Sequence, residues 1–223
     1  MDEVKMSAKT RALRKYEAAP TPYASDLAAP RLDLLSPFGP LIGKTELAPE
    51  LVDRINQYAD RHVLDGAGSE FLLPRDIVFD PSELSLGRQI DSLIRRYLLA
   101  IDGIAPRSVT IDAVWVVSQR EGTPSPMHFH TGDISGVLYL KTPKVDREGL
   151  EEQKTYISGR QAGYINFLIG GKQKYAKSLV SFKPRVGDFY IFPGWLLHGA
   201  EPFRGSGERR SLAFNTFVND AEC

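Results

Sequence analysis

The chain has 223 residues, 42% of them hydrophobic and 25% charged, and it carries 28 basic and 28 acidic side chains. This composition is typical of one soluble globular domain, and the balanced charge argues against a nucleic-acid or anionic-membrane partner. The single cysteine, Cys223, excludes an intramolecular disulfide and a cysteine-based zinc site. Without a membrane-spanning apolar run or a signal-peptide core, we expect a cytoplasmic protein.

The first residues predict an arm rather than a core element. Residues 1–35 are mostly polar and hold a short proline-containing stretch, so we interpret them as an N-terminal arm. The segment 32–41 contains Pro37 and Pro40, which indicates an irregular segment or an edge strand.

Two helices are expected next. Apolar residues recur at helical spacing over 47–63 and again over 80–101. Asp80 suits the cap and Pro81 the first turn of the second helix. Between the two helices, 66–69 reads as a glycine-rich loop. Both helices are interpreted as packing elements without a chemical role.

From residue 108 onward the pattern changes to short β-rich runs separated by turns. Strands are predicted over 109–117, 135–140, 178–183, 189–192 and 209–218. Helices followed by a series of short strands indicate an α+β protein with an antiparallel sandwich or barrel in its C-terminal half.

A pair of histidines stands directly before one of these strands. His128 and His130 are two positions apart, and residues two apart in a strand point to the same face. Imidazole is a ligand for Zn, Cu, Fe and Ni, so both rings could reach one metal ion. Taken alone, the pair is a weak signal, because such a pair is more often two histidines that hydrogen-bond along a strand. His198, which follows another aromatic strand, favours the metal site.

The last predicted strand carries an unusual face. With period two, Arg209, Ser211, Ala213 and Asn215 share one side of the strand. A small, polar face with an arginine at its mouth suits a pocket for a carboxylate, since guanidinium binds carboxylate through two hydrogen bonds and a serine adds a hydroxyl donor. The alternative is a solvent-facing strand with an ordinary surface arginine.

Taken together, these stretches resemble the 2-oxoglutarate- and Fe(II)-dependent dioxygenases, most of all a bacterial and phage branch whose His-x-His motif is followed by Ser-Gly-x-x-Tyr. The resemblance covers about residues 110–218 and is carried by His128–His130, Ser135–Leu140, Gly187-Asp188, Pro193–His198 and Glu208–Asn215. It implies an α+β fold with a double-stranded β-helix (jelly-roll) core and N-terminal buttressing helices. The single domain would span 36–223, with its helical part at about 36–105 and its jelly-roll core at about 106–220.

The same resemblance implies a role for each site residue. His128 and His198 match the family's metal-binding histidines, and Arg209 matches the arginine that binds the far carboxylate of 2-oxoglutarate. Tyr139 and Ser211 would support that carboxylate. The implied cofactors are Fe(II) and 2-oxoglutarate. With O2, they would hydroxylate an unknown prime substrate and release succinate and CO2.

One position departs from the family pattern. The superfamily has a carboxylate two residues after its first histidine, and here that residue is His130. We favour His130 as the third ligand; Asp133 could instead supply a carboxylate, or the site could hold another metal or little metal. The alternative functions are a cupin-like three-histidine enzyme that does not use 2-oxoglutarate and a catalytically silent jelly-roll binding module. The prime substrate and a homo-oligomeric state stay open.

Overall fold

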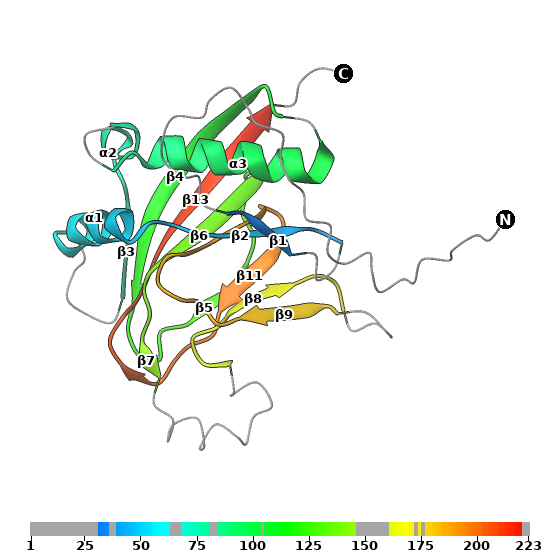
Figure 1. The fold of residues 1–223 in the computed structure, drawn as a ribbon. Helices are drawn as coiled ribbons and strands as arrows, with labels where there is room; N and C mark the ends of the chain where they lie inside the picture. The colour runs from blue at the N-terminus through cyan, green and yellow to red at the C-terminus, as the bar shows by residue number, and fades with distance from the viewer. Residues whose placement is uncertain are drawn as a thin grey trace.

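The structure is a computed structural model, and it describes residues 31–35, 39–62, 68–80, 84–103, 105–145, 161–171, 174 and 177–219. Helices, a large sheet and a small sheet form three successive layers (Figure 1). This is the α+β jelly-roll arrangement that the sequence predicts. Most of the predicted arm, residues 1–30, lies outside the described residues.

All paired strands are antiparallel. The large sheet has the order β1 (Asp33–Leu35), β2 (Ile42–Glu46), β10 (Asp188–Pro193), β6 (Ile134–Lys141), β13 (Arg209–Asn219), β4 (Ser108–Gln119) and β3 (Gly68–Leu72). The small sheet has the order β5 (Ser125–His128), β11 (Leu197–Ala200), β8 (Ile165–Leu168) and β9 (Leu179–Phe182). A two-stranded ribbon joins β7 (Lys144–Val145) to β12 (Gly205–Ser206).

Three helices cover the outer face of the large sheet (Figure 1): α1 (Pro49–Asp60), α2 (Arg75–Phe79) and α3 (Leu86–Asp102). Their buried side chains pack with Leu138, Phe189, Leu212 and Phe214 of the sheet into the larger core cluster. Within the described part of the chain, no helix has the length and apolar character needed to cross a membrane.

The second predicted helix begins later than its sequence indicates. Asp80 follows α2 and donates its backbone N–H to the carbonyl of Asp76, so it does not cap α3. The chain enters α3 through Ser85, whose φ of 55° is left-handed and cannot continue a right-handed helix. The predicted start at residue 80 is therefore wrong, whereas the predicted end is close to the observed Asp102.

The N-terminal half supplies strands as well as helices. β1 pairs with β2 and forms one edge of the large sheet, in agreement with the edge strand predicted for 32–41. β3 forms the opposite edge on β4, although its first residues were predicted as a glycine-rich loop. Glycine weakens a strand signal, and the β4 ladder supplies the pairing that local propensity lacks.

Alternation along the central strands decides where the site lies. In β13, Leu212 and Phe214 face the helical layer, whereas Arg209, Ser211 and Ala213 line a cavity on the other side. In β6, Leu138 packs with the helices and Tyr139 packs between the two sheets. Period-two geometry thus presents one largely apolar face to the helices and one mixed face to the small sheet.

Candidate metal and cosubstrate site

His128 and His198 face each other across the small sheet. His128 ends β5, His198 lies in β11, and the two are direct partners in the antiparallel ladder. Directly opposed residues project to the same side of a sheet, and the ring centroids are accordingly 4.5 Å apart. The pairing brings together two histidines that are distant in the sequence.

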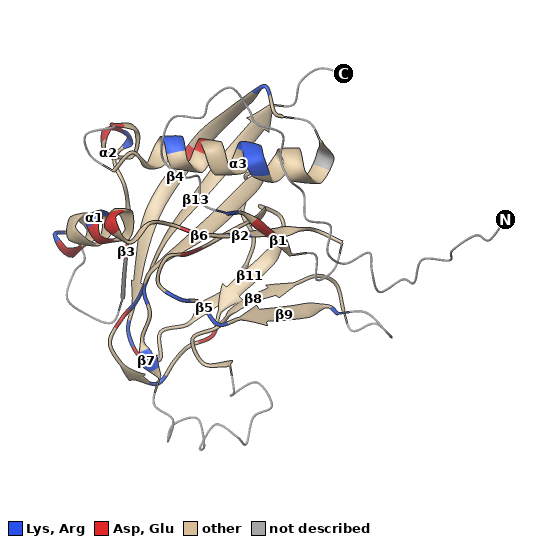
Figure 2. Ribbon diagram, viewed as in Figure 1, with Lys and Arg blue, Asp and Glu red and all other residues tan. Residues whose placement is uncertain are grey.

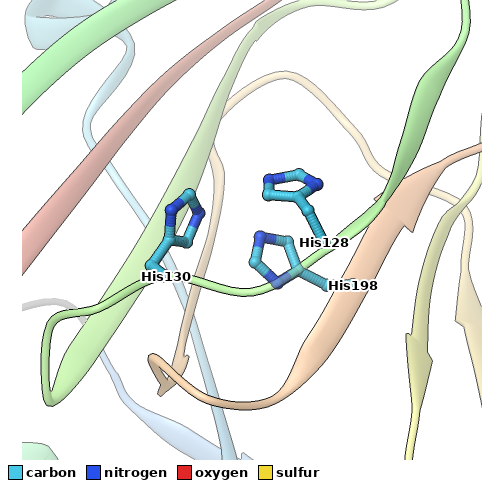
Figure 3. A group of neighbouring side chains, drawn as sticks. All are labelled: His128, His130 and His198. Carbon is cyan, nitrogen blue, oxygen red and sulfur yellow. The ribbon is translucent and has the colours of Figure 1, made fainter.

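His130 completes the group from a loop. β5 ends at His128, so His130 lies beyond the strand and does not have the strand geometry assumed for the pair. Its backbone N–H is donated to the carbonyl of Gly194. The Gly194 loop lies so close to Gly132 that any side chain at Gly194 would collide with the Gly132 carbonyl. This backbone contact turns the third ring toward the other two (Figure 3).

The three rings converge (Figure 3), and one nitrogen of each lies within 4.8 Å of the others. His130 is 4.9 Å from His128 and 5.0 Å from His198 between ring centroids. The indole of Trp115 stands edge-on against His130 at 5.5 Å and limits the movement of that ring. Such a trio can supply three ligands to one ion.

Hydrogen bonds fix the tautomers of two of the rings. Nδ1 of His128 lies 2.7 Å from the carbonyl oxygen of Pro126, and Nδ1 of His198 lies 2.9 Å from that of Leu196. A carbonyl only accepts, so each Nδ1 carries the proton and donates it. Each Nε2 is then left with a lone pair that can bind a metal. Metal-binding histidines in proteins usually donate their other ring N–H in this way.

Burial keeps the rings of His198 and His130 neutral. It lowers the pKa of His198 to about 3, with smaller lowering effects from His128 and His130 against an opposing hydrogen bond to the Leu196 carbonyl. Burial, and then the proximity of His128, lowers the pKa of His130 to about 4. At neutral pH, protons therefore do not compete for these two lone pairs.

A cavity of about 80 Å³ extends from the histidines between the two sheets. That is several times the volume that one water requires. Its walls come from six strands, and its lining includes Trp115, Val117, Tyr139, Ile165, Ser211 and Ala213 besides the histidines. The four strands of the small sheet contain no Asp, Glu, Lys or Arg, so one wall is uncharged (Figure 2).

Among the described residues that line the cavity, only Arg209 carries a full charge. Its side chain is only 2% exposed, and burial lowers the pKa of the guanidinium while nearby Tyr139 and Glu201 raise it. Nε donates to Oε1 of Gln119 at 2.8 Å, and Nη1 donates to the carbonyl of Glu201 at 2.5 Å. Nη2 is buried and has no hydrogen-bond partner among the described residues. Both acceptors are neutral, so this cation lacks an anion at hydrogen-bond distance there.

Arg209 lies at the end of the small sheet opposite to the histidines. Its partner Glu201 directly follows β11, and His198 stands three residues earlier, which is about 10 Å along a strand. A five-carbon dicarboxylate that reached a metal with one end and hydrogen-bonded to Nη2 with the other would span a comparable length. The three imidazoles at one end and the guanidinium at the other therefore fit Fe(II) and 2-oxoglutarate.

Comparison with known proteins agrees with this geometry. Residues 113–215 match the model of a family described as "Putative 2OG-Fe(II) oxygenase". Those residues are a 2OG-Fe(II) oxygenase domain. The family, the jelly-roll fold and the two cofactors implied by the sequence resemblance are thereby confirmed. No curated protein sequence matches the chain.

Solved structures share the fold of the oxygenase domain at low sequence identity. The collagen prolyl hydroxylase of Paramecium bursaria Chlorella virus-1, solved with 2-oxoglutarate, is 16% identical with a TM-score of 0.54, over 81% of this chain and 96% of its own. A Pseudomonas putida prolyl-4-hydroxylase is 14% identical with a TM-score of 0.50, over 81% and 93%. HygX of Streptomyces hygroscopicus, with nickel and 2-oxoglutarate, is 11% identical with a TM-score of 0.51, over 79% and 82%.

The supporting residues predicted for the oxygenase lie in the cavity. Ser211 and Tyr139 line it and are direct partners in the β13–β6 ladder. Burial raises the pKa of the Tyr139 phenol well above its ordinary value, although Arg209 acts in the opposite direction. Tyr139 therefore stays protonated and offers an O–H donor near the guanidinium.

Asp133, the alternative third ligand, has another partner. Its side chain is exposed, and Oδ2 accepts a hydrogen bond of 2.8 Å from the backbone N–H of Val218. Its backbone N–H is donated to the carbonyl of Thr216. These contacts direct Asp133 toward the far end of β13, and it is not a member of the three-histidine group found among the described residues.

Two contributors to the oxygenase site were missed by sequence reasoning: Gln119 and the backbone carbonyl of Glu201, which hold Arg209. Gln119 is the last residue of β4 and lies opposite Arg209 in the ladder. The only sequence signal for it would have been a polar residue at the end of a strand that pairs with β13. The Glu201 carbonyl has no side-chain signal at all.

Proposed function

We propose that the oxygenase domain holds Fe(II) through His128, His130 and His198 and holds the far carboxylate of 2-oxoglutarate through Arg209. The domain would then hydroxylate a prime substrate at carbon. The observation that carries this proposal is the buried, unpaired Nη2 of Arg209 in the cavity that the three histidines line. A buried donor without a partner is costly, and a bound carboxylate would satisfy it.

Each protein group has a task that follows from its contacts. The Pro126 and Leu196 carbonyls hold two imidazoles with their lone pairs toward the common point. Arg209 orients one end of the cosubstrate, while the hydroxyls of Tyr139 and Ser211 can donate to the same carboxylate. The apolar lining excludes water, which strengthens these electrostatic contacts.

The bound Fe(II) and 2-oxoglutarate would supply the oxidising chemistry: 2-oxoglutarate and O2 become succinate and CO2, and one oxygen atom enters a C–H bond of the substrate. Three imidazoles carry no negative charge, so the metal end would be one charge more positive than with the usual carboxylate ligand. A cosubstrate with two negative charges would offset this additional positive charge.

The test is a titration of the anaerobic Fe(II) protein with 2-oxoglutarate, followed by the visible charge-transfer band of the chelated metal. The wild type should give a band that saturates. Arg209→Met keeps the apolar stem but removes the guanidinium, and it should raise the Kd for 2-oxoglutarate about 100-fold because a charged hydrogen-bonded pair is lost. Arg88→Met, at an exposed arginine of α3, is the matched control and should leave the Kd unchanged.

The outcomes separate the alternatives. Stoichiometric iron without a band at any 2-oxoglutarate concentration would contradict the proposal and favour a three-histidine enzyme that does not use this cosubstrate. A protein that binds no Fe(II) would favour the alternative of a catalytically silent binding module. If the band forms but Arg209→Met leaves the Kd for 2-oxoglutarate unchanged, Arg209 does not bind the far carboxylate.

The third ligand is tested by a pair of variants. His130→Ala should weaken Fe(II) binding by at least about tenfold, because one of three protein ligands is lost. Asp133→Ala should leave Fe(II) affinity unchanged, since the Asp133 carboxylate hydrogen-bonds to Val218. The reverse result would assign the carboxylate in place of His130.

A further inference from the structure

We infer that Gln119 is a positioning residue for cosubstrate binding: it aims the Arg209 guanidinium into the cavity and ties it to the strand that carries His128. The inference rests on the proposed function, because it assigns how the 2-oxoglutarate clamp is held. Gln119 is buried and lines the cavity next to Arg209.

The orientation of the Gln119 amide is fixed at both ends. Oε1 accepts from Nε of Arg209 at 2.8 Å, and Nε2 donates to the carbonyl of Pro124 at 3.1 Å. A guanidinium can only donate and a carbonyl can only accept, so the amide cannot be turned round without losing both bonds. Gln119 also lies directly opposite Arg209 in the β4–β13 ladder, which keeps the two side chains in register.

These contacts connect the clamp to both histidine-bearing strands. Pro124 directly precedes β5, and Glu201, the second acceptor for Arg209, directly follows β11. At that end of the ladder Ser125 pairs with Ala200, and at the other end His128 pairs with His198. Arg209 is therefore attached, through Gln119 and through the Glu201 carbonyl, to the same ribbon that presents two histidines.

The neutrality of Gln119 matters for the ligand. Among the described residues that line the cavity there is no aspartate or glutamate, so the positive charge of Arg209 is available to a bound carboxylate. Gln119 satisfies Nε without neutralising the cation, and it leaves Nη2 unpaired. A carboxylate at this position would hold the guanidinium as well but would compete with the cosubstrate for its charge.

The experiment compares two keto acids on the anaerobic Fe(II) protein. 2-Oxoglutarate uses both the metal and the clamp, whereas pyruvate has the same keto-acid end and no far carboxylate. Gln119→Leu should raise the Kd for 2-oxoglutarate about tenfold and change the Kd for pyruvate by less than about twofold. Gln119→Glu serves if the leucine variant folds poorly: it loses the donation to the Pro124 carbonyl and adds a charge that competes for Arg209, so it should show the same selectivity.

Two controls make the result specific. Gln161→Leu removes a half-buried glutamine that hydrogen-bonds to Ser181 and does not line the cavity, so its Kd values should match the wild type. In an Arg209→Met background, Gln119→Leu should cause no further loss, because a residue that acts through Arg209 has nothing left to position.

The failure of this inference is distinguishable from failure of the proposed function. A wild type that binds no 2-oxoglutarate would overturn the proposed function itself. If the wild type binds it and both Gln119 variants keep the wild-type Kd, the positioning role is overturned. Equal weakening of 2-oxoglutarate and pyruvate would also overturn it, since that pattern indicates a general structural loss at the metal end.

Discussion

Two adjacent arginines on β13 are both buried and yet have opposite surroundings. Arg210 points toward the helical layer, where Glu208 accepts from its Nε and Nη2, and Asp60 and Asn56 of α1 accept from its Nη1. Glu208 also accepts from Ser118 and pairs with Lys141. Arg209 points into the cavity and has two neutral acceptors, and one of its nitrogens has no partner among the residues that the structure describes.

The difference separates a structural cation from a ligand-binding one. Every nitrogen of Arg210 has an acceptor in the described structure, and its ion pairs fasten α1 to the large sheet. Arg209 is desolvated without an equivalent anion, so its remaining hydrogen bond is available to a ligand. Burial of charge alone does not mark a functional residue, whereas burial with incomplete pairing does.

The largest expected effect comes from the structural arginine. Arg210→Met should lower the free energy of unfolding by about 3–5 kcal/mol, because buried Glu208 would lose its two hydrogen bonds from Arg210 and keep only the longer contact with Lys141. Arg209→Met, the matched substitution one residue away, should change it by less than about 1 kcal/mol, since it removes a cation that is incompletely paired. Urea denaturation of the metal-free proteins measures both; similar losses would abolish the distinction.

The pH dependence of stability should also differ between the two sides of the sheet. His198 has a folded pKa of about 3 against an ordinary value of 6.5, so the unfolded chain binds more protons between these values. Stability should therefore fall as the pH drops below 6.5, by roughly 2 kcal/mol at pH 5 from His198 alone.

On the helical side, loss should begin only at lower pH. Burial raises the pKa of Glu208, but hydrogen bonds from Ser118 and Arg210 outweigh it and hold the pKa below 4.5. Its stabilisation is present above that value and is lost as the pH falls through the folded pKa. In unfolding curves from pH 7 to pH 3, His198→Leu should flatten the upper part and Glu208→Gln only the lower part. A single loss shared by both variants would argue against this assignment.

The smallest expected effect comes from a substitution on the cavity-facing side of β13. Ser211→Ala should raise the Kd for 2-oxoglutarate about fivefold, as expected for one hydrogen bond of about 1 kcal/mol. Thr216→Val, farther along the same strand, removes a hydroxyl that donates to the Ile134 carbonyl outside the cavity. That control should lower stability without changing the Kd, and a Kd that responds to both variants would show that the two effects are not separable.

Much of this site could be predicted from the sequence because β geometry is periodic. Period two correctly placed Arg209, Ser211 and Ala213 on one face, and all three line the cavity. The spacing of His128 and His130 predicted convergence, and their rings do converge. The stated reason was incomplete, however, since β5 ends at His128 and the Gly194 carbonyl orients the third ring.

The sequence could not predict how the strands align with one another or how the backbone is held between elements. Gln119 matters because the β4–β13 ladder sets it opposite Arg209, and ladder register is not encoded in either strand alone. Likewise, the start of α3 depends on a left-handed Ser85 that a helix-capping pattern around Asp80 does not reveal. β3 likewise forms the edge of the large sheet because it pairs with β4, and not because its own residues favour a strand.

The pairing of His128 with His198 has a consequence for folding order. The two positions are about seventy residues apart, and contacts that close so long a loop form late because chain entropy opposes them. We expect the polypeptide to complete its sandwich first and to acquire iron afterwards, so the ion would be loaded onto a finished protein rather than nucleate it. Iron supply in the cell would then determine how much of the protein is active, not how much of it folds.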